Sequence, residues 1–124
     1  GTREIEEAVQ AHPAIAEVAV VGVADQVKGQ MPTAFAVVRD LAQVATPESR
    51  LALEQQVLQT VDGLLGPIAR PNHVHFVTAL PKTRSGKLLR RSIQAIAEGR
   101  EPGDLTTIEG PGALEQIKDA LREG

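Results

Sequence analysis

Residues 15–23 have the sequence IAEVAVVGV, a run of β-branched and small apolar residues that carries one charge, Glu17. Such a run is typical of a strand with both faces largely covered. A second strand is predicted at residues 33–38, TAFAVV. Residues 24–30 between them contain turn formers and are few enough to join two antiparallel strands. The sequence therefore predicts a β-hairpin at the centre of the fold.

Helices are predicted on both sides of this hairpin. Residues 2–11 have apolar side chains at helical spacing, and Pro13 ends this helix because the residue before a proline resists helical geometry. A longer helix is predicted from Thr46, a good N-cap followed by Pro47, to the glycine at position 66. The early carboxylates Glu4, Glu6 and Glu7 are expected to form a solvated helical face.

The remaining pattern predicts one more strand and two more helices. Residues 73–77 alternate as a short strand does, and residues 88–97 have the spacing of an amphipathic helix. We expect residues 1–100 to form one domain, followed by a tail, 101–124, with a short helix around Leu114. The predicted fold class is α+β, with helices packed on a small, mostly antiparallel sheet.

Composition limits the possible functions. The chain has 124 residues, enough for one domain, and begins at Gly1, as an excised fragment would. It has no cysteine, so a disulfide framework and a thiolate metal site are excluded, and a reducing cytoplasm is the expected location. A net charge of −3, two Phe and no Trp or Tyr argue against nucleic acid as a partner, and no apolar run is long enough to span a membrane.

The segment 81–87, PKTRSGK, has the features of an exposed loop that presents one lysine. Gly86 can adopt positive φ, and the hydroxyls of Thr83 and Ser85 can hold the turn. Lys87 is then expected at the tip, anchored by the helix that follows. The segment is not a phosphate-binding P-loop, because the first glycine of that motif is replaced by proline and its final hydroxyl residue by leucine.

The residues alone leave three interpretations of this loop open. Five cations lie within ten residues: Lys82, Arg84, Lys87, Arg90 and Arg91. They could form a solvated basic face, a non-enzymatic binding surface for an acidic partner or nucleic acid, or the setting of one catalytic or ligand-contacting lysine.

A family resemblance favours the last interpretation. The segment 81–87 followed by Arg90-Arg91 closely resembles the lysine motif of short-chain acyl-CoA synthetases, the acetate and propionate ligases of the acyl-adenylate-forming superfamily. The resemblance extends over nearly the whole chain, and residues 73–77 and the tail are nearer to propionate than to acetate ligases. Further segments that carry it are Glu4-Ile5-Glu6, His12-Pro13, Lys28-Gly29-Gln30, Gly66-Pro67, Arg70-Pro71 and residues 103–108.

The resemblance implies a mobile C-terminal domain of an AMP-forming ligase. In this family a fatty acid and ATP give acyl-AMP and pyrophosphate, and coenzyme A then displaces AMP. Lys87 would be the catalytic lysine of adenylation and the target of regulatory acylation by a lysine acyltransferase, reversed by a deacylase; Arg84, Ser85 and Gly86 would form the nucleotide loop. ATP with its magnesium, coenzyme A and the acid would be substrates of the full-length enzyme, completed by its own N-terminal domain, and the isolated chain would hold no cofactor and be inactive.

Two further observations concern individual residues. Acetate ligases carry an arginine where this chain has Asp62, so no coenzyme A contact is assigned to that helix. His73 and His75 fall on one face of a strand but lack a third ligand, so both are expected to be partly exposed structural residues and no metal site is predicted. His12 is expected to be a helix-terminal residue.

Overall fold

The computed structural model describes residues 1–27, 29–103, 109–110 and 112–123. The tail segment 104–108 and Lys28, which contribute to the family resemblance, lie outside the described residues. In chain order the elements are α1 (Thr2–Gln10), β1 (Ile15–Asp25), β2 (Gly29–Val38), the 3-10 helix η1 (Leu41–Val44), α2 (Pro47–Leu65), the 3-10 helix η2 (Pro67–Ala69), β3 (Val74–Phe76), α3 (Arg90–Ala97) and α4 (Gly112–Glu123). None of the described helices is long and apolar enough to cross a membrane.

The described sheet has three strands in the order β1-β2-β3. β1 and β2 form the predicted antiparallel hairpin, whereas β3 runs parallel to β2. The parallel pair is possible because α2 lies between β2 and β3 in the chain and provides the crossover that parallel strands require. The predicted α+β class is confirmed, and the sheet is mixed.

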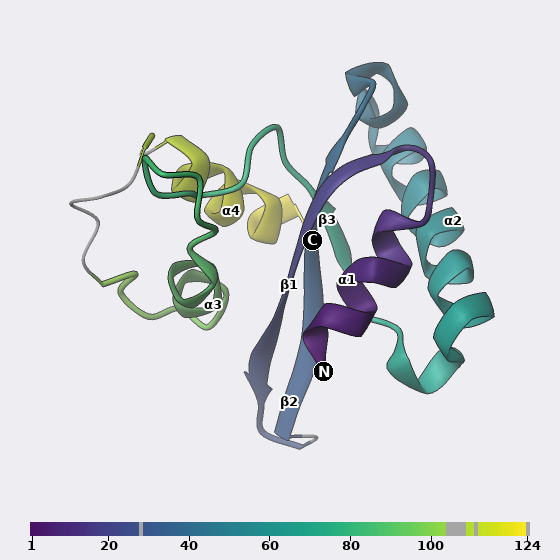
Figure 1. Ribbon diagram of the computed structural model, residues 1–124, viewed down its shortest axis with the longest axis horizontal. Coiled ribbons are helices and arrows are strands. Elements are labelled where there is room, and N and C mark those ends of the chain that lie inside the picture. Colours follow the sequence, from purple (N-terminus) through teal and green to yellow (C-terminus); the bar gives the residue numbers. More distant parts are fainter. Residues whose placement is uncertain (28, 104–108, 111, 124) are drawn as a thin grey trace.

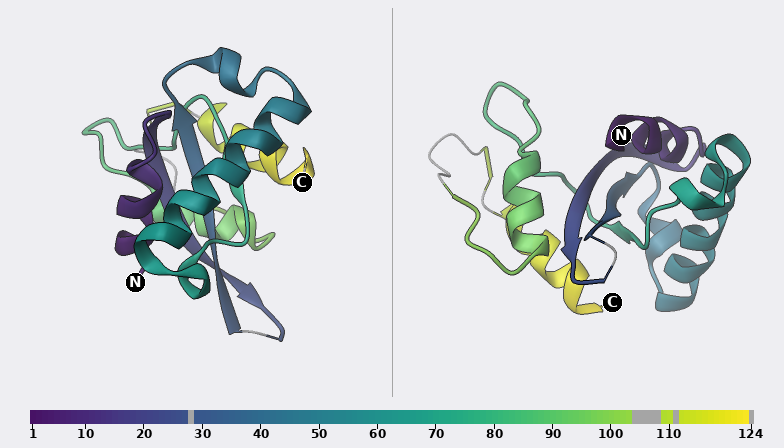
Figure 2. Two further views of the ribbon diagram at one scale, coloured as in Figure 1. Left: turned by 90° about the vertical axis from the view of Figure 1, so that its right-hand side faces the viewer. Right: turned by 90° about the horizontal axis from the view of Figure 1, so that it is seen from below.

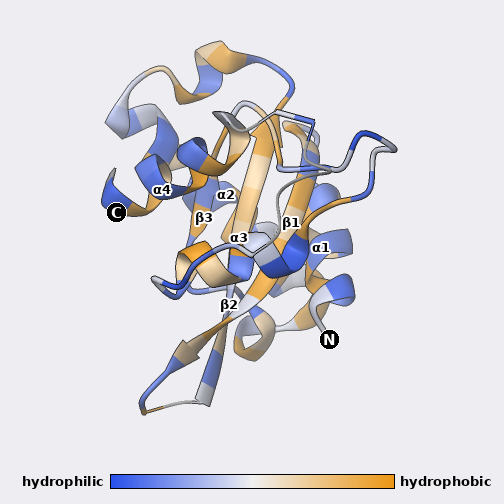
Figure 3. Ribbon diagram, turned by 90° about the vertical axis from the view of Figure 1, so that its left-hand side faces the viewer, coloured by the Kyte–Doolittle hydropathy of each residue, from blue (hydrophilic) through white to orange (hydrophobic). Residues whose placement is uncertain are grey.

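Helices cover both faces of the sheet (Figures 1 and 2). One core lies between the sheet and α1 and α2, with Val9, Val20 and Val57 among its buried residues. The second lies between the other face and α3 and α4, with Phe35 and Ile117 among its buried residues. Figure 3 shows the central strands coloured as hydrophobic along most of their length, as expected for strands covered on both sides.

The element ends differ from the predicted ones in a few places. Both hairpin strands extend well into the predicted link. Directly after β1, the Val27 amide donates a hydrogen bond to the Asp25 carboxylate at 2.8 Å. The third strand and the third helix are shorter than predicted, and η1 was not predicted. The Thr46 cap is confirmed as a capping box with Ser49.

The helix predicted in the tail is α4. It packs against α3, and its residues Leu114, Ile117 and Ala120 are buried in the second core. The boundary proposed at residue 100 stays a prediction.

Candidate functional site

The predicted lysine loop is a short hairpin, residues 81–89. Lys82 and Leu88 pair as an isolated antiparallel bridge. The Thr83 amide donates to the Lys87 carbonyl at 2.8 Å, and the Leu89 amide donates to the Pro81 carbonyl at 3.0 Å. These bonds keep the two arms of the loop together although neither belongs to the main sheet.

The turn at the tip depends on one glycine and one hydroxyl. The Gly86 amide donates to the Thr83 carbonyl at 2.9 Å, and Gly86 has φ +88°, in the region that L-residues avoid. This is the pattern of a three-residue hairpin loop closed by a left-handed glycine. The Thr83 hydroxyl accepts a hydrogen bond from the Lys87 amide at 3.0 Å and lies 2.9 Å from the Ser85 hydroxyl. The backbone of Lys87 is therefore fixed at the point where its side chain leaves the loop.

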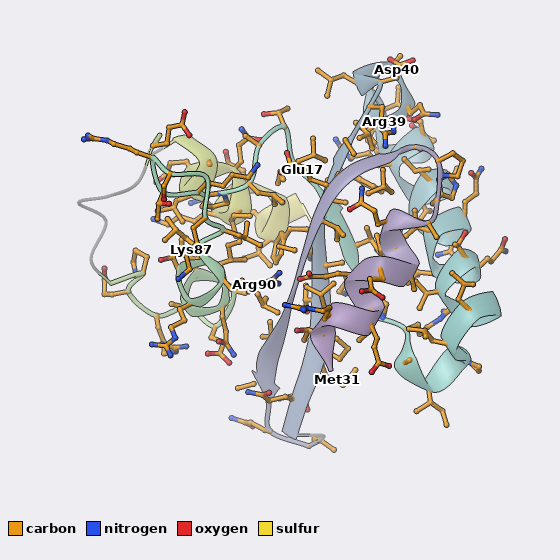
Figure 4. All side chains as sticks on the ribbon, viewed as in Figure 1. Glu17, Met31, Arg39, Asp40, Lys87 and Arg90 are labelled. Atoms are coloured by element: carbon orange, nitrogen blue, oxygen red, sulfur yellow. The ribbon has the colours of Figure 1, made fainter. Side chains whose placement is uncertain are left out.

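The Lys87 side chain is exposed. It has no ion pair or hydrogen bond with another side chain among the described residues. Lys87 lines an open hollow with the residues that follow it, up to Ser92 at the start of α3. Figure 4 shows Lys87 beside α3, on the side of the molecule away from α1 and α2, and Figure 2 shows the segment that leads into α3 projecting from the body of the domain.

The five cations of the loop and of the start of α3 fall into two groups. Lys82 forms an ion pair with Glu17 of β1, and Arg90 forms one with Glu6 of α1. The hydrogen bonds that Arg90 donates to Glu6 raise the pKa of its guanidinium. The other three, Arg84, Lys87 and Arg91, are exposed and have no carboxylate partner among the residues that the structure describes.

Glu6 and Glu17 were missed as site residues by sequence reasoning. Glu6 was expected on a solvated face, but its side chain is only 13% exposed, so this prediction was wrong. Its partner Arg90 lies 84 residues away in the chain, and Lys82 lies 65 residues from Glu17. No local pattern could have identified either pair.

Asp62 has a local partner. Arg70 donates to both of its carboxylate oxygens, from Nε to Oδ1 at 3.0 Å and from Nη2 to Oδ2 at 2.5 Å. These hydrogen bonds lower the pKa of Asp62 and raise that of Arg70. The pair ties the end of α2 to the segment that leads into β3, so Asp62 has a structural partner at the position where acetate ligases carry arginine.

The histidines differ in exposure. The His75 ring stacks on Phe35, with centroids 5.2 Å apart, and is 8% exposed, so the prediction that it is partly exposed was wrong. Burial, and then the nearby His73, lower the pKa of His75 to about 4. The His73 ring is half exposed, and its Nδ1 lies 3.8 Å from a Glu54 oxygen. His12 lies at the end of α1, where its Nδ1 accepts a hydrogen bond from the Ala14 amide at 3.1 Å.

Within the described part of the chain, no cluster of three His, Cys, Asp or Glu side chains could hold a metal ion.

Comparison with known proteins identifies the family of the chain. The family model described as "AMP-binding enzyme C-terminal domain" matches residues 4–87. The chain is 52% identical over 123 residues to a propionate–CoA ligase of Escherichia coli and 47% identical over 123 residues to an acetyl-coenzyme A synthetase of Pyrobaculum arsenaticum. Each alignment covers 99% of this chain but 20% and 18%, respectively, of the relative, so the chain spans about a fifth of the length of these relatives.

The fold also matches solved structures. Acetoacetyl-CoA synthetase from Streptomyces lividans aligns with 99% of this chain and 18% of its own, with a TM-score of 0.74 and 20% sequence identity. At that identity the likeness concerns the fold alone.

Proposed function

Because the chain belongs to the family of AMP-binding enzyme C-terminal domains, we propose that it is the C-terminal domain of a cytoplasmic, AMP-forming acyl-CoA ligase whose acid is propionate. In the first half-reaction a carboxylate oxygen attacks the α-phosphorus of ATP, and pyrophosphate leaves. In the second, the thiol of coenzyme A attacks the acyl carbon, and AMP leaves. ATP with its magnesium, the acid and coenzyme A bind to the N-terminal domain of the same enzyme or at its junction with this one.

Lys87 is the catalytic residue of the first half-reaction in this proposal. The attacking carboxylate and the phosphate repel each other, and negative charge builds on the departing pyrophosphate. An ammonium group placed between them stabilises the transition state more than the ground state. The observation that supports this role is the exposed Lys87 side chain, which has no partner among the described residues and extends from a hairpin whose backbone is hydrogen-bonded.

The other residues of the tip are proposed to border the nucleotide. A Cβ atom added at Gly86 would meet no atom within 4 Å, so the backbone there is open to close approach. Arg84 is exposed and lacks a described partner, which leaves its guanidinium available for phosphate. Ser85 offers its hydroxyl beside them.

Lys87 is also the proposed site of regulation. Acylation of its amine by a lysine acyltransferase would remove the positive charge that adenylation uses, and a deacylase would restore it. The modification should block the first half-reaction and leave thioester formation from supplied acyl-AMP largely intact.

The decisive test uses the full-length enzyme with Lys87→Ala. Pyrophosphate exchange into ATP, which reports adenylation, should fall by roughly 10²-fold or more. Thioester formation from supplied acyl-AMP should remain within about twofold, because only the first half-reaction needs the charge. Lys118→Ala, which removes an exposed lysine of α4, is the matched control. Equal loss of both half-reactions in Lys87→Ala would refute the assignment.

The identity of the acid is tested separately. The propionate ligase and the acetate ligase differ by only five percentage points in identity to this chain, and acyl selectivity would depend on a pocket in the N-terminal domain. We expect a higher kcat/KM for propionate than for acetate in the exchange assay. The reverse order would assign acetate and leave the role of Lys87 unaffected.

A further inference from the structure

One edge of β1 is bonded by side chains instead of a strand. β1 is first in the strand order, so in the described structure only its other edge pairs with β2. On the free edge, the Val20 amide donates to the Glu6 carboxylate at 2.8 Å, the Gly22 carbonyl accepts from Gln94 at 2.5 Å, and the Ala24 amide donates to Glu98 at 2.6 Å. Alternate residues of a strand present their polar groups to the same edge, which explains this spacing.

Two of these three side chains come from α3 and its C-cap: Gln94 lies in α3, and Glu98 directly follows its last residue. Gln94 and Glu98 lie one helical turn apart and fix α3 along the β1 edge. The hydrogen bonds from Arg100, and then the one from the Ala24 amide, lower the pKa of Glu98. Since α3 directly follows the lysine loop, one arm of the loop is held in place by this edge.

Ion pairs hold both arms of the loop. Lys82, in the first arm, pairs with Glu17, whose side chain is 41% exposed. Arg90, just after the second arm, pairs with Glu6, and a second bond between them measures 2.8 Å. Glu6 belongs to α1, which packs on the opposite face of the sheet from α3, so its carboxylate binds Arg90 across the edge of β1 that does not face β2.

We propose that Glu6 and Glu17 are positioning residues that fix the lysine loop, and with it Lys87, relative to α1 and β1. The inference rests on the proposed function, because it assumes that Lys87 acts in adenylation. A cation accelerates that step only when it is held where charge develops, and small misplacements of a reacting group are costly. The loop belongs to no main strand, so its direction depends on the contacts of its two arms.

If the two carboxylates had a purely structural role, their substitution would lower the melting temperature and both half-reactions together. The positioning role predicts a domain that stays folded. Partly exposed ion pairs contribute little to stability, so neutralising Glu17 should leave folding almost unchanged. The Glu6→Gln side chain keeps an oxygen that can accept from Val20 but loses its charge toward Arg90. Both substitutions should therefore move the loop without unfolding the domain.

The test compares the two half-reactions in the full-length enzyme. Glu17→Gln and Glu6→Gln should each lower the kcat of pyrophosphate exchange by about tenfold, with KM for the acid and for ATP within about twofold. Thioester formation from supplied acyl-AMP and the melting temperature should be nearly unchanged. Glu7→Gln, an exposed neighbour of Glu6 on α1, is the control and should match the wild type.

A charge exchange provides the sharper readout. Either single charge reversal should slow pyrophosphate exchange. The double variant Glu17→Lys with Lys82→Glu should recover most of the lost rate. The positioning role is refuted if both half-reactions and the melting temperature fall together. It is also refuted if the double charge reversal does not restore the rate of pyrophosphate exchange. Wild-type exchange rates in the Gln variants, beside a strong Lys87→Ala defect, would refute this inference alone. An unaffected Lys87→Ala enzyme would refute the proposed function and the inference with it.

Discussion

Lowering the pH should destabilise the domain through His75. In the folded chain the imidazole is 8% exposed, and burial lowers its pKa to about 4. In the unfolded chain its pKa returns to about 6.5. Between these values the unfolded state binds more protons, so stability is fully present above about pH 6.5 and is lost as the pH falls toward 4.

The size of the effect follows from the two pKa values. The binding polynomials of the folded and unfolded states give a loss of about 2 kcal/mol between about pH 7 and about pH 5. The carboxylates with lowered pKa values, Asp62 and Glu98, add a loss of the same sign, but mainly at lower pH, near the ordinary pKa values of those groups.

Urea denaturation of the 124-residue chain at both pH values measures this loss. With a slope of about 1–3 kcal/mol per molar, the midpoint should fall by about 1 M. In His75→Phe, which retains an aromatic ring against Phe35, most of the pH dependence should disappear. If His75→Phe loses as much stability as the wild type over this interval, the buried imidazole is not its source and the reasoning fails.

Two further pairs of substitutions test the loop and the core. Alanine disfavours φ +88°, so Gly86→Ala should lower the free energy of unfolding by about 1–2 kcal/mol in the urea assay or, if the turn rearranges instead, lower pyrophosphate exchange in the full-length enzyme. Gly86→Asn should have a smaller effect, because asparagine tolerates positive φ better than alanine does. Equal effects of the two substitutions would contradict this account of the turn. Val57→Ala, at a fully buried position of the first core, should cost about 2–3 kcal/mol, whereas Leu64→Ala, at a position 59% exposed, should be nearly neutral in the same assay.

Local sequence signals predicted most of the fold. The β-branched run at residues 15–23 and the cap at Thr46 identified β1 and the start of α2, because both depend on residues close together in the chain. The parallel placement of β3 was not predicted, since a strand of three residues carries little local information on its direction, which depends on the α2 crossover between β2 and β3. η1 begins at a single Asp40 cap, too weak a signal to stand out in a loop.

The candidate site was predictable only in part. Gly86, Thr83 and Lys87 lie within five residues, so their turn could be anticipated from residue chemistry. The two carboxylates that hold the loop could not, because each pair joins residues more than sixty positions apart. His75 could be placed on a strand, but its burial depends on Phe35 of the neighbouring strand.

The distribution of charge around the loop also bears on the alternatives that the sequence left open. A surface that follows a nucleic-acid backbone needs several cations free to contact phosphates. Here Lys82 and Arg90 are neutralised by carboxylates of the same domain, which leaves Arg84, Lys87 and Arg91 without a described carboxylate partner, and the net charge is −3. We propose that a chain in which Lys82 and Arg90 fix the loop, and in which Lys87 extends from a hydrogen-bonded turn, is better suited to placing one charge accurately than to binding a polyanion.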